Sequence, residues 1–145
     1  MWFRQKIQTM SRQTDIKTIP VVALVLENHQ GDILIQQRTK GKHLAGLWEF
    51  PGGKVEPGET HENALVREIQ EELNYTPQNP KHLITVSHQY PEKAIELIVF
   101  YEQSNNPVVS AAENQPLKWT PKDELKNSPM PEADLPIINL ISRQS

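Results

Sequence analysis

Apolar positions along this chain fall into short runs that predict a β-sheet. The run from Thr18 to Glu27 is almost continuously apolar and rich in β-branched residues, which is typical of a strand buried on both faces. Asn28–Gly31 provides a turn, and Asp32–Arg38 returns as the second strand of a hairpin. Further strands are predicted at residues 47–50, 83–89, 95–101 and 117–120.

Two other segments repeat their apolar residues every three or four positions, as amphipathic helices do. The first covers residues 61–73, with Thr60 as its N-cap and Asn74 as a residue able to close it in a left-handed conformation. The second covers residues 135–143, and a helical turn is expected at 121–125. Strands combined with one central and one terminal helix indicate a layered α/β (α+β) domain.

Length, composition and charge narrow the class of protein. A chain of 145 residues fits one domain, placed here at 17–145. Residues 1–16 carry cationic side chains without an apolar core, so we expect a flexible leader and no secretory signal, with Met10 as the more natural start and residues 1–9 of uncertain origin. No run approaches about eighteen apolar residues, so no membrane partner is expected. The absence of cysteine excludes disulfides and thiolate metal sites and suits a cytoplasmic protein, and the net charge of −3 argues against polymeric nucleic acid.

Three acidic residues of the central helix point to a metal ion. Glu68, Glu71 and Glu72 are spaced three and four apart, directly after Arg67. At about 100° per residue, their carboxylates fall within an arc of roughly 100° on one side of the helix, where like charges repel. A hard divalent cation offsets this repulsion, and Mg²⁺ takes oxygen ligands of this kind.

The alternative is that these glutamates are simply a solvated helix surface, which is the more common role of an acidic helix. Leu65, Ile69 and Leu73, however, occupy the adjoining arc, so the carboxylates lie on the shoulder of the buried face. The preceding run Trp48–Gly53 ends in Pro-Gly-Gly, a turn suited to close backbone approach. Both features favour a functional site.

The same stretch resembles the signature of the Nudix hydrolases, Gly-x5-Glu-x7-Arg-Glu-U-x-Glu-Glu-x-Gly-U, where U is a bulky apolar residue. Eight positions of this sequence match the signature: Gly53, Glu59, Arg67, Glu68, Ile69, Glu71, Glu72 and Tyr75. Asn74 replaces the last glycine, and Asn is the next residue best able to adopt the left-handed helix end. Eight matches at fixed spacing make the resemblance specific.

Resemblance to this family implies the Nudix fold, an α/β/α sandwich around a mixed sheet that carries a loop–helix–loop motif. It also implies hydrolysis of a nucleoside diphosphate linked to a further group, with Mg²⁺ as cofactor and Mn²⁺ as its substitute. Arg67 would orient a carboxylate, with Glu59 as its partner. The metal ligands implied by the resemblance are oxygen donors of the motif: Gly52 through its carbonyl, Glu68, Glu71 and Glu72.

Outside the signature, the chain is most similar to the MutT-like group of the family, over residues 19–140. In that group a loop glutamate within a Glu-x-Gln-Pro-x-x-Trp run binds metal and is a candidate general base, and Glu113 matches its position. The alternative for Glu113 is a solvated loop carboxylate. Substrate contacts are expected from residues that flank the glycine turn: Arg38, Glu49, Phe50 and Lys54.

Asp134 is the residue expected to read the base. MutT-like enzymes that act on 8-oxo-dGTP use an Asn at the start of the last helix, where this chain has Asp134. An Asp side chain cannot donate a hydrogen bond unless it is protonated, whereas an Asn both donates and accepts. The local pattern Ala-Asp-aliphatic-Pro instead resembles the related CTP and oxidised-pyrimidine pyrophosphohydrolases. A helix N-cap is a further role for Asp134, compatible with base reading.

The expected function is Mg²⁺-dependent hydrolysis of 8-oxo-dGTP, or of a related oxidised dNTP, to the monophosphate and pyrophosphate. This activity would cleanse the nucleotide pool and limit mutation. One alternative is a CTP or pyrimidine nucleotide pyrophosphohydrolase, and another is a dinucleoside polyphosphate or ADP-ribose hydrolase. A non-catalytic 8-oxoguanine-recognition domain is disfavoured, because such domains tend to lose the motif carboxylates. We expect a monomer or weak homodimer whose partner is a small nucleotide.

Overall fold

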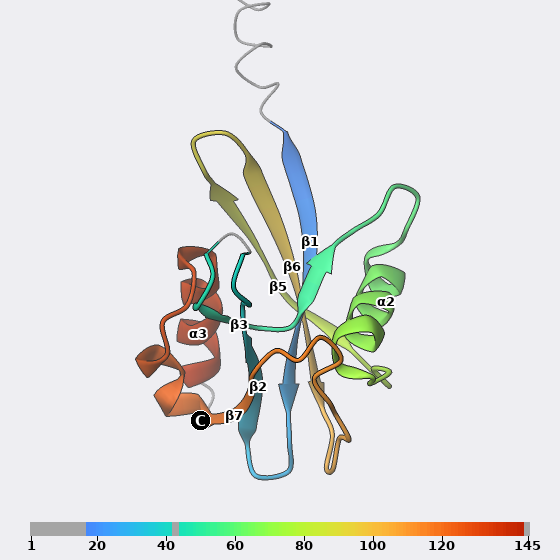
Figure 1. Cartoon of the computed structure of the whole chain (residues 1–145), viewed down its shortest axis with the longest axis vertical. Helices are drawn as coiled ribbons and strands as arrows, with labels where there is room; N and C mark the ends of the chain where they lie inside the picture. The colour runs from blue at the N-terminus through green and yellow to red at the C-terminus, as the bar shows by residue number, and fades with distance from the viewer. Residues whose placement is uncertain (1–16, 42–43, 144–145) are drawn as a thin grey trace, which may run out of the picture.

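A mixed seven-stranded sheet lies at the centre of the part of the chain that the structure, a computed structural model, describes: residues 17–41 and 44–143 (Figure 1). The predicted leader at 1–16 lies outside these residues. The strands are β1 Thr18–Glu27, β2 Asp32–Gln37, β3 Trp48–Glu49, β4 Gly52–Lys54, β5 Lys81–Gln89, β6 Ala94–Gln103 and β7 Leu117–Pro121. The helices are α2 His61–Leu73 and α3 Leu135–Ser142, with 3-10 helices η1 Lys122–Asn127 and η2 Glu132–Asp134. None of these helices is long and apolar enough to cross a membrane.

The predicted elements are confirmed, with small shifts at their ends. The helix at 61–73 has the predicted bounds, and each predicted strand is present within about two residues at either end. Two elements were not predicted. Strand β4 forms in the segment that was interpreted only as a glycine turn, and η2 forms in the proline-rich stretch before the last helix.

The sheet is organised around β1, which is parallel to β6 along its whole length. Strand β5 is antiparallel to β6 at one edge. On its other side β1 pairs with β2 only where Glu27 meets Ile33, and from there the two strands diverge. The opened edge of β1 pairs with β4 at Val21–Ala23, whereas β2 pairs with β3 and β7. A gap between the two groups of strands therefore widens away from the hairpin.

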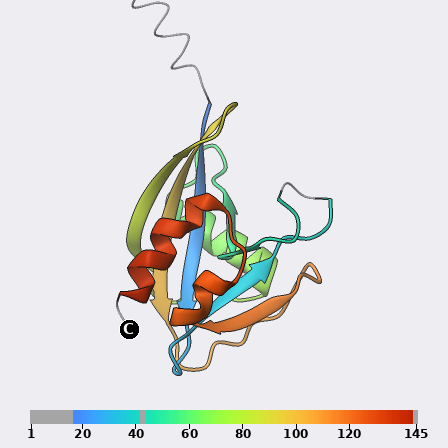
Figure 2. The same ribbon diagram turned by 90° about the vertical axis from the view of Figure 1, so that its left-hand side faces the viewer.

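Helices cover both faces of this sheet, α2 on one side and α3 on the other (Figures 1 and 2). Because β1 is buried on both faces, alternate residues belong to different cores. The core beneath α2 comprises Val22, Leu24, Leu26, Leu34, Ala64, Leu65, Ile69, Leu73, Ile98 and Phe100. The core beneath α3 comprises Ala23, Val25, Ile33, Ile35, Phe50, Leu97, Val99, Leu125, Ala133, Ile137, Ile138 and Ile141. The expected α/β/α sandwich is confirmed.

The ends of α2 are held as predicted. Thr60 Oγ1 accepts a hydrogen bond from the Asn63 N–H at 3.1 Å, which satisfies one of the unpaired donors of the first turn. Asn74 has φ 52° and ψ 36°, and its N–H donates to the carbonyl of Gln70. An asparagine thus ends the helix in the left-handed conformation that usually requires glycine.

The predicted capping of the last helix by the Asp134 side chain is wrong. Asp134 directly precedes α3, but it has φ −86° and ψ −14° and its side chain makes no capping hydrogen bond. Pro136 lies in the first turn, where its missing N–H has no helical partner to lose. The side chain of Asp134 is therefore available for another role.

The loop between β6 and β7 is attached to the C-terminal end of α2. The Ser110 N–H donates to the carbonyl of Leu73 at 2.9 Å, and the Ala112 N–H donates to the carbonyl of Glu72 at 3.0 Å. These bonds satisfy carbonyls that the end of a helix leaves without an intrahelical partner. They also hold the segment that carries Glu113 beside the acidic helix.

Candidate functional site

Glu68 and Glu72 reach from α2 to the backbone of β4. A Cβ atom at Gly53 would lie 2.3 Å from the carboxyl carbon of Glu68, so this acid packs directly over the glycine. The Gly52 N–H donates to Glu72 Oε1 at 3.4 Å. Glu72 is buried, and the Glu68 side chain is 17% exposed. Gly53 thus provides the close approach to Glu68, whereas Gly52 lies directly against the backbone of β1.

We predict that Gly53→Ala impairs the site and leaves the fold intact. The three atoms nearest to the added methyl group all belong to the movable carboxylate of Glu68, so we expect kcat to fall about tenfold or more as that carboxylate is displaced. The matched variant is Gly52→Ala, whose Cβ would lie 1.9 Å from the backbone oxygen of Val22. That variant should lower the melting temperature by about 5 °C or more. Equal melting temperatures for the two variants would contradict this distinction.

Arg67 is the cation that organises the outer side of this cluster. Its Nε and one terminal nitrogen donate to the two oxygens of Glu59, at 2.7 and 2.9 Å, which confirms the predicted pairing. Its other contacts are Glu68 Oε1 at 2.9 Å, the Lys54 carbonyl at 3.0 Å and Glu71 Oε2 at 3.5 Å. The hydrogen bonds from Arg67 hold the pKa of Glu59 at about 2. Arg67 therefore ties the helix, the preceding loop and β4 together.

Glu72 has an environment unfavourable to its charged form. Burial raises the pKa of its carboxyl well above the ordinary value. A hydrogen bond from Gln36 acts in the opposite direction, and the carboxylates of Glu68 and Glu49 raise the pKa further. A bound cation would favour the ionised form and relieve this repulsion.

The chemistry of the predicted metal ligands fits a hard metal ion, although two of their carboxylates contact other residues of this chain. Within residues 17–41 and 44–143, no three acidic or histidine side chains converge as a group of metal ligands. Arg67 holds Glu68, Gln36 holds Glu72, and the Glu71 side chain is 59% exposed. All the donors are oxygens, which suits Mg²⁺. The predicted ligand set stays a prediction.

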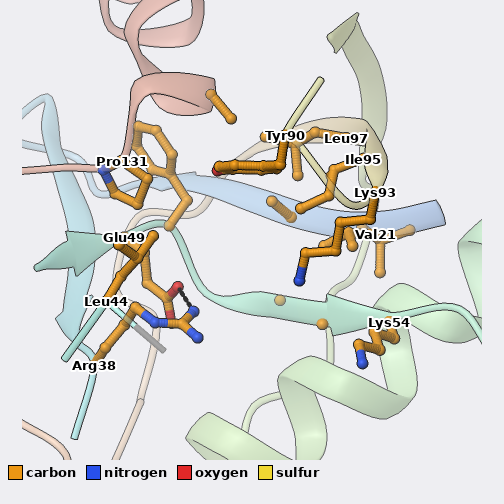
Figure 3. A pocket seen from close by; sticks show the side chains of 16 residues that line it. Val21, Arg38, Leu44, Glu49, Lys54, Tyr90, Lys93, Ile95, Leu97 and Pro131 are labelled. Atoms are coloured by element: carbon orange, nitrogen blue, oxygen red, sulfur yellow. Dashed lines mark hydrogen bonds and ion pairs between the residues drawn. The ribbon is translucent and has the colours of Figure 1, made fainter. Parts of the chain in front are cut away.

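A pocket of about 370 Å³ opens beside the acidic cluster, in the gap between the two groups of strands (Figure 3). Gly52 and Gly53 belong to its wall, so the pocket and the cluster are contiguous. Figure 3 shows the ammonium group of Lys93 directed into the pocket, between Tyr90 and Lys54. The structure brings four of the predicted substrate residues to the wall: Arg38, Glu49, Phe50 and Lys54.

Asp134, the fifth predicted substrate residue, lies next to the end of the pocket that Arg38 and Glu49 form. These two residues are an ion pair at 2.7 Å, and both are close enough to Asp134 to act on its pKa. Burial raises the pKa of Asp134 to about 7, Glu49 adds to the increase, and Arg38 opposes it. Ala133, which precedes Asp134, lines the pocket. A buried carboxyl with this pKa is present in both protonation states near neutrality.

Three residues near the site were missed or only partly interpreted from the sequence. Tyr90 was assigned to a turn, whereas its ring forms part of the pocket wall and its pKa is raised by burial and by Asp134. Gln36 and Gln115 received no role, yet both are buried and hydrogen-bonded to Glu72. A tyrosine before proline and a polar residue within an apolar strand were the available signals.

Glu113 is exposed, and a hydrogen bond of its backbone N–H links it to the acidic cluster. Its N–H donates to Gln115 Oε1 at 3.0 Å, and Gln115 in turn donates to the carbonyl of Glu72 at 2.9 Å. The predicted loop residue is thus linked to the end of α2 through one side chain. Its role as base or metal ligand stays a prediction.

The sequence is similar to known proteins over most of its length. The CTP pyrophosphohydrolase of Escherichia coli (strain K12) is 36% identical over 123 residues, which cover 85% of this chain and 90% of that protein. The 8-oxo-dGTP diphosphatase of the same organism is 32% identical over 128 residues, which cover 88% of this chain and 99% of that protein.

Solved structures show the same relationship. A MutT structure, from work on the proteins of Aliivibrio salmonicida and Vibrio cholerae, has a TM-score of 0.72 and 31% identity and covers 89% of this chain and 100% of that one. The solution structure of the E. coli ORF135 protein has a TM-score of 0.75 and 35% identity, with coverage of 87% and 89%. The family model described as NUDIX domain matches residues 22–140. The chain therefore belongs to the Nudix hydrolase family, among its MutT-like members.

Proposed function

We propose that the protein is a Mg²⁺-dependent nucleoside triphosphate pyrophosphohydrolase that releases a nucleoside monophosphate and pyrophosphate. The observation that carries this proposal is the contiguity of a nucleotide-sized pocket with the acidic cluster, through Gly52 and Gly53. Two lysines line the pocket, Lys54 and Lys93, and they suit a polyphosphate anion, whereas Arg38 in the same wall is paired with Glu49.

The residues that would hold the metal are Glu68, Glu71, Glu72, the Gly52 carbonyl and Glu113. When bound, Mg²⁺ neutralises phosphate oxygens and lowers the pKa of a coordinated water. The protein itself supplies position and charge: Arg67 keeps Glu68 in place, and the pocket orients the nucleotide for in-line displacement. Glu113 would act as general base or as an additional ligand.

For the base we propose 8-oxoguanine, read by Asp134. Guanine carries an acceptor at N7, whereas 8-oxoguanine carries an N–H there, which a carboxylate accepts. A protonated carboxyl would in addition donate to O6, and the pKa of Asp134, raised to about 7, allows this form near neutrality. The relative named 8-oxo-dGTP diphosphatase, which this chain matches over 99% of that protein, supports this choice.

CTP is the second candidate. The relative named CTP pyrophosphohydrolase is 36% identical over 85% of this chain. The N4 amino group of cytosine donates to an acceptor, and N3 accepts from a protonated carboxyl, so Asp134 also complements this base. Nucleotide-pool sanitation would then concern cytosine or oxidised pyrimidine nucleotides.

A substrate panel tests the proposed function. We expect kcat/KM for 8-oxo-dGTP to exceed the value for dGTP at least about tenfold, because one buried hydrogen bond separates the two bases. The panel should contain 8-oxo-dGTP, dGTP, CTP, dCTP, 5-hydroxy-dCTP, ADP-ribose and diadenosine tetraphosphate, each assayed with Mg²⁺. Preference for CTP would select the second candidate. Hydrolysis of ADP-ribose or diadenosine tetraphosphate alone would contradict the triphosphate assignment.

A further inference from the structure

Two buried glutamines connect the acidic cluster, the nucleotide pocket and the loop that carries Glu113. Gln36, on β2, donates its amide to Glu72 Oε1 and, at 3.4 Å, to Glu49 Oε2. The side-chain oxygen of Gln36, Oε1, accepts a hydrogen bond from Gln115 Nε2 at 3.1 Å. Both glutamines are 5% exposed. The amides are thus enclosed by the protein and are not solvated surface groups.

The orientation of both amides is fixed by their partners. An ionised carboxylate and a carbonyl oxygen only accept hydrogen bonds, so with Glu72 and Glu49 ionised Gln36 presents its NH₂ group to both. Gln115 must likewise present its NH₂ group to the carbonyl of Glu72, because its Oε1 receives the Glu113 N–H. Rotating either amide by 180° would place acceptors against acceptors. A buried network with one satisfied arrangement is rigid.

We propose that Gln36 is a positioning residue that fixes the carboxylate of Glu72 for metal binding and ties it to the nucleotide pocket. The link to the pocket is the weaker of the two contacts: the Gln36 amide lies 3.4 Å from Glu49 Oε2, and the other oxygen of Glu49 receives the 2.7 Å hydrogen bond from Arg38 in the pocket wall. A second tie runs through Gln115 to the backbone of Glu113. The inference rests on the proposed function, because it assigns Glu72 to the metal site of that reaction.

Gln36 gives Glu72 its main side-chain contact. A second donor to the same oxygen, the Gly52 N–H, lies at 3.4 Å and forms only a weak hydrogen bond at that distance. Without the amide, the buried carboxylate would be free to turn away from the orientation that it has in the cluster. Partners that hold a metal ligand in place typically contribute about ten- to a hundredfold to metal affinity.

The test is Gln36→Met, which removes the amide and keeps most of the side-chain volume. We expect the dissociation constant for Mn²⁺, measured by calorimetry without nucleotide, to rise about tenfold or more. We also expect kcat to fall about tenfold, with KM for the nucleotide changing less than about threefold, because the pocket wall is retained. Gln37→Met is the matched control: the Gln37 side chain donates to the Gly46 carbonyl, at 3.0 Å, and both quantities should stay within about twofold.

A double-mutant cycle shows whether Gln36 acts through Glu72. In the Glu72→Gln background, Gln36→Met should change Mn²⁺ affinity by less than about twofold, because the carboxylate that it positions is gone. An equal loss in both backgrounds would overturn the proposal. So would a Gln36→Met enzyme with wild-type kcat and wild-type Mn²⁺ affinity.

A second variant covers the case in which Gln36→Met does not fold, and the metal titration covers the case in which the enzyme shows no turnover. If Gln36→Met is unfolded at the assay temperature, Gln36→Asn serves in its place, since the shorter side chain withdraws the amide from Glu72. The titration requires no turnover. A wild-type protein that hydrolyses no nucleoside triphosphate would refute the proposed function, whereas a tenfold weaker Mn²⁺ affinity in Gln36→Met would still uphold the positioning role.

Discussion

Replacing Glu68 with Gln is expected to lower kcat at least about a hundredfold at saturating Mg²⁺, while the protein stays folded. The carboxylate lies over Gly53, accepts a hydrogen bond from Arg67 and adjoins Glu72, so the change removes a charge at the centre of the acidic cluster. That charge is needed where phosphate charge is redistributed in the transition state. Steady-state kinetics and a melting curve of the same preparation measure both effects.

Two further variants provide the control and the comparison for Glu68→Gln. Glu62→Gln changes an exposed glutamate in the first turn of the same helix, and its turnover should equal that of wild type. Glu113→Gln should slow turnover by less than Glu68→Gln, because water partly replaces an exposed loop carboxylate. Retention of more than half of wild-type turnover by Glu68→Gln would show that this residue holds no metal. An unchanged pH–rate profile and turnover in Glu113→Gln would reduce Glu113 to a solvated position.

Asp134→Ala is expected to reduce kcat/KM about ten- to a hundredfold for the preferred nucleotide and far less for poor substrates. The expected loss corresponds to one buried hydrogen bond to a charged group, about 1.5–3 kcal/mol. Asp134 is 7% exposed, and the charges of Glu49 and Arg38 are near enough to act on its pKa, so water cannot readily take its place. The measurement is the ratio of kcat/KM values across the nucleotide panel, for wild type and variant. An equal loss for every nucleotide would assign Asp134 a structural role.

The stability of Asp134→Asn provides an independent check, and its sign follows from the raised pKa. The pKa of Asp134 is about 7 in the folded protein against an ordinary 3.8. Between these values the folded state binds the proton more tightly than the unfolded state, so the free energy of unfolding falls as the pH rises from about 4 to 7. Asparagine does not ionise. We therefore expect the melting temperature of Asp134→Asn, relative to wild type, to be higher at pH 8 than at pH 5. A lower melting temperature at both pH values would instead indicate that the Asp134 carboxyl has a structural role that asparagine does not fill.

Local signals were sufficient to predict the acidic helix from the sequence. Thr60 and Asn74 mark its two ends, and their side-chain chemistry acts on the nearest backbone groups. The spacing of the glutamates placed Glu68, Glu71 and Glu72 on the shoulder of the buried face, and of these Glu71 is 59% exposed. The pairing of Arg67 with Glu59 followed from the family signature. These features depend on residues close in sequence.

Other parts of the site depend on contacts between distant segments, which one sequence does not reveal. Gly52–Lys54 becomes a strand because the open edge of β1 pairs with it, although glycine alone disfavours strands. Gln36 follows the buried run Ile33–Ile35. Because both faces of β2 are covered, alternation of apolar and polar residues could not show which groups the Gln36 side chain contacts. Tyr90 approaches Asp134 only when the β5–β6 hairpin meets η2.

The divergence of β1 from β2 separates the site into two parts, and Gln36 bridges them through Glu72 and Glu49. The acidic helix and β4 are attached to β1, whereas β3 and the segment around η2 supply the wall near Asp134. Substitutions in residues 129–135 should therefore alter the choice of base while the phosphate-cleaving half keeps its geometry. For protein engineering, this makes the segment a replaceable cassette: exchanging it between relatives would move nucleotide preference without rebuilding the hydrolytic apparatus.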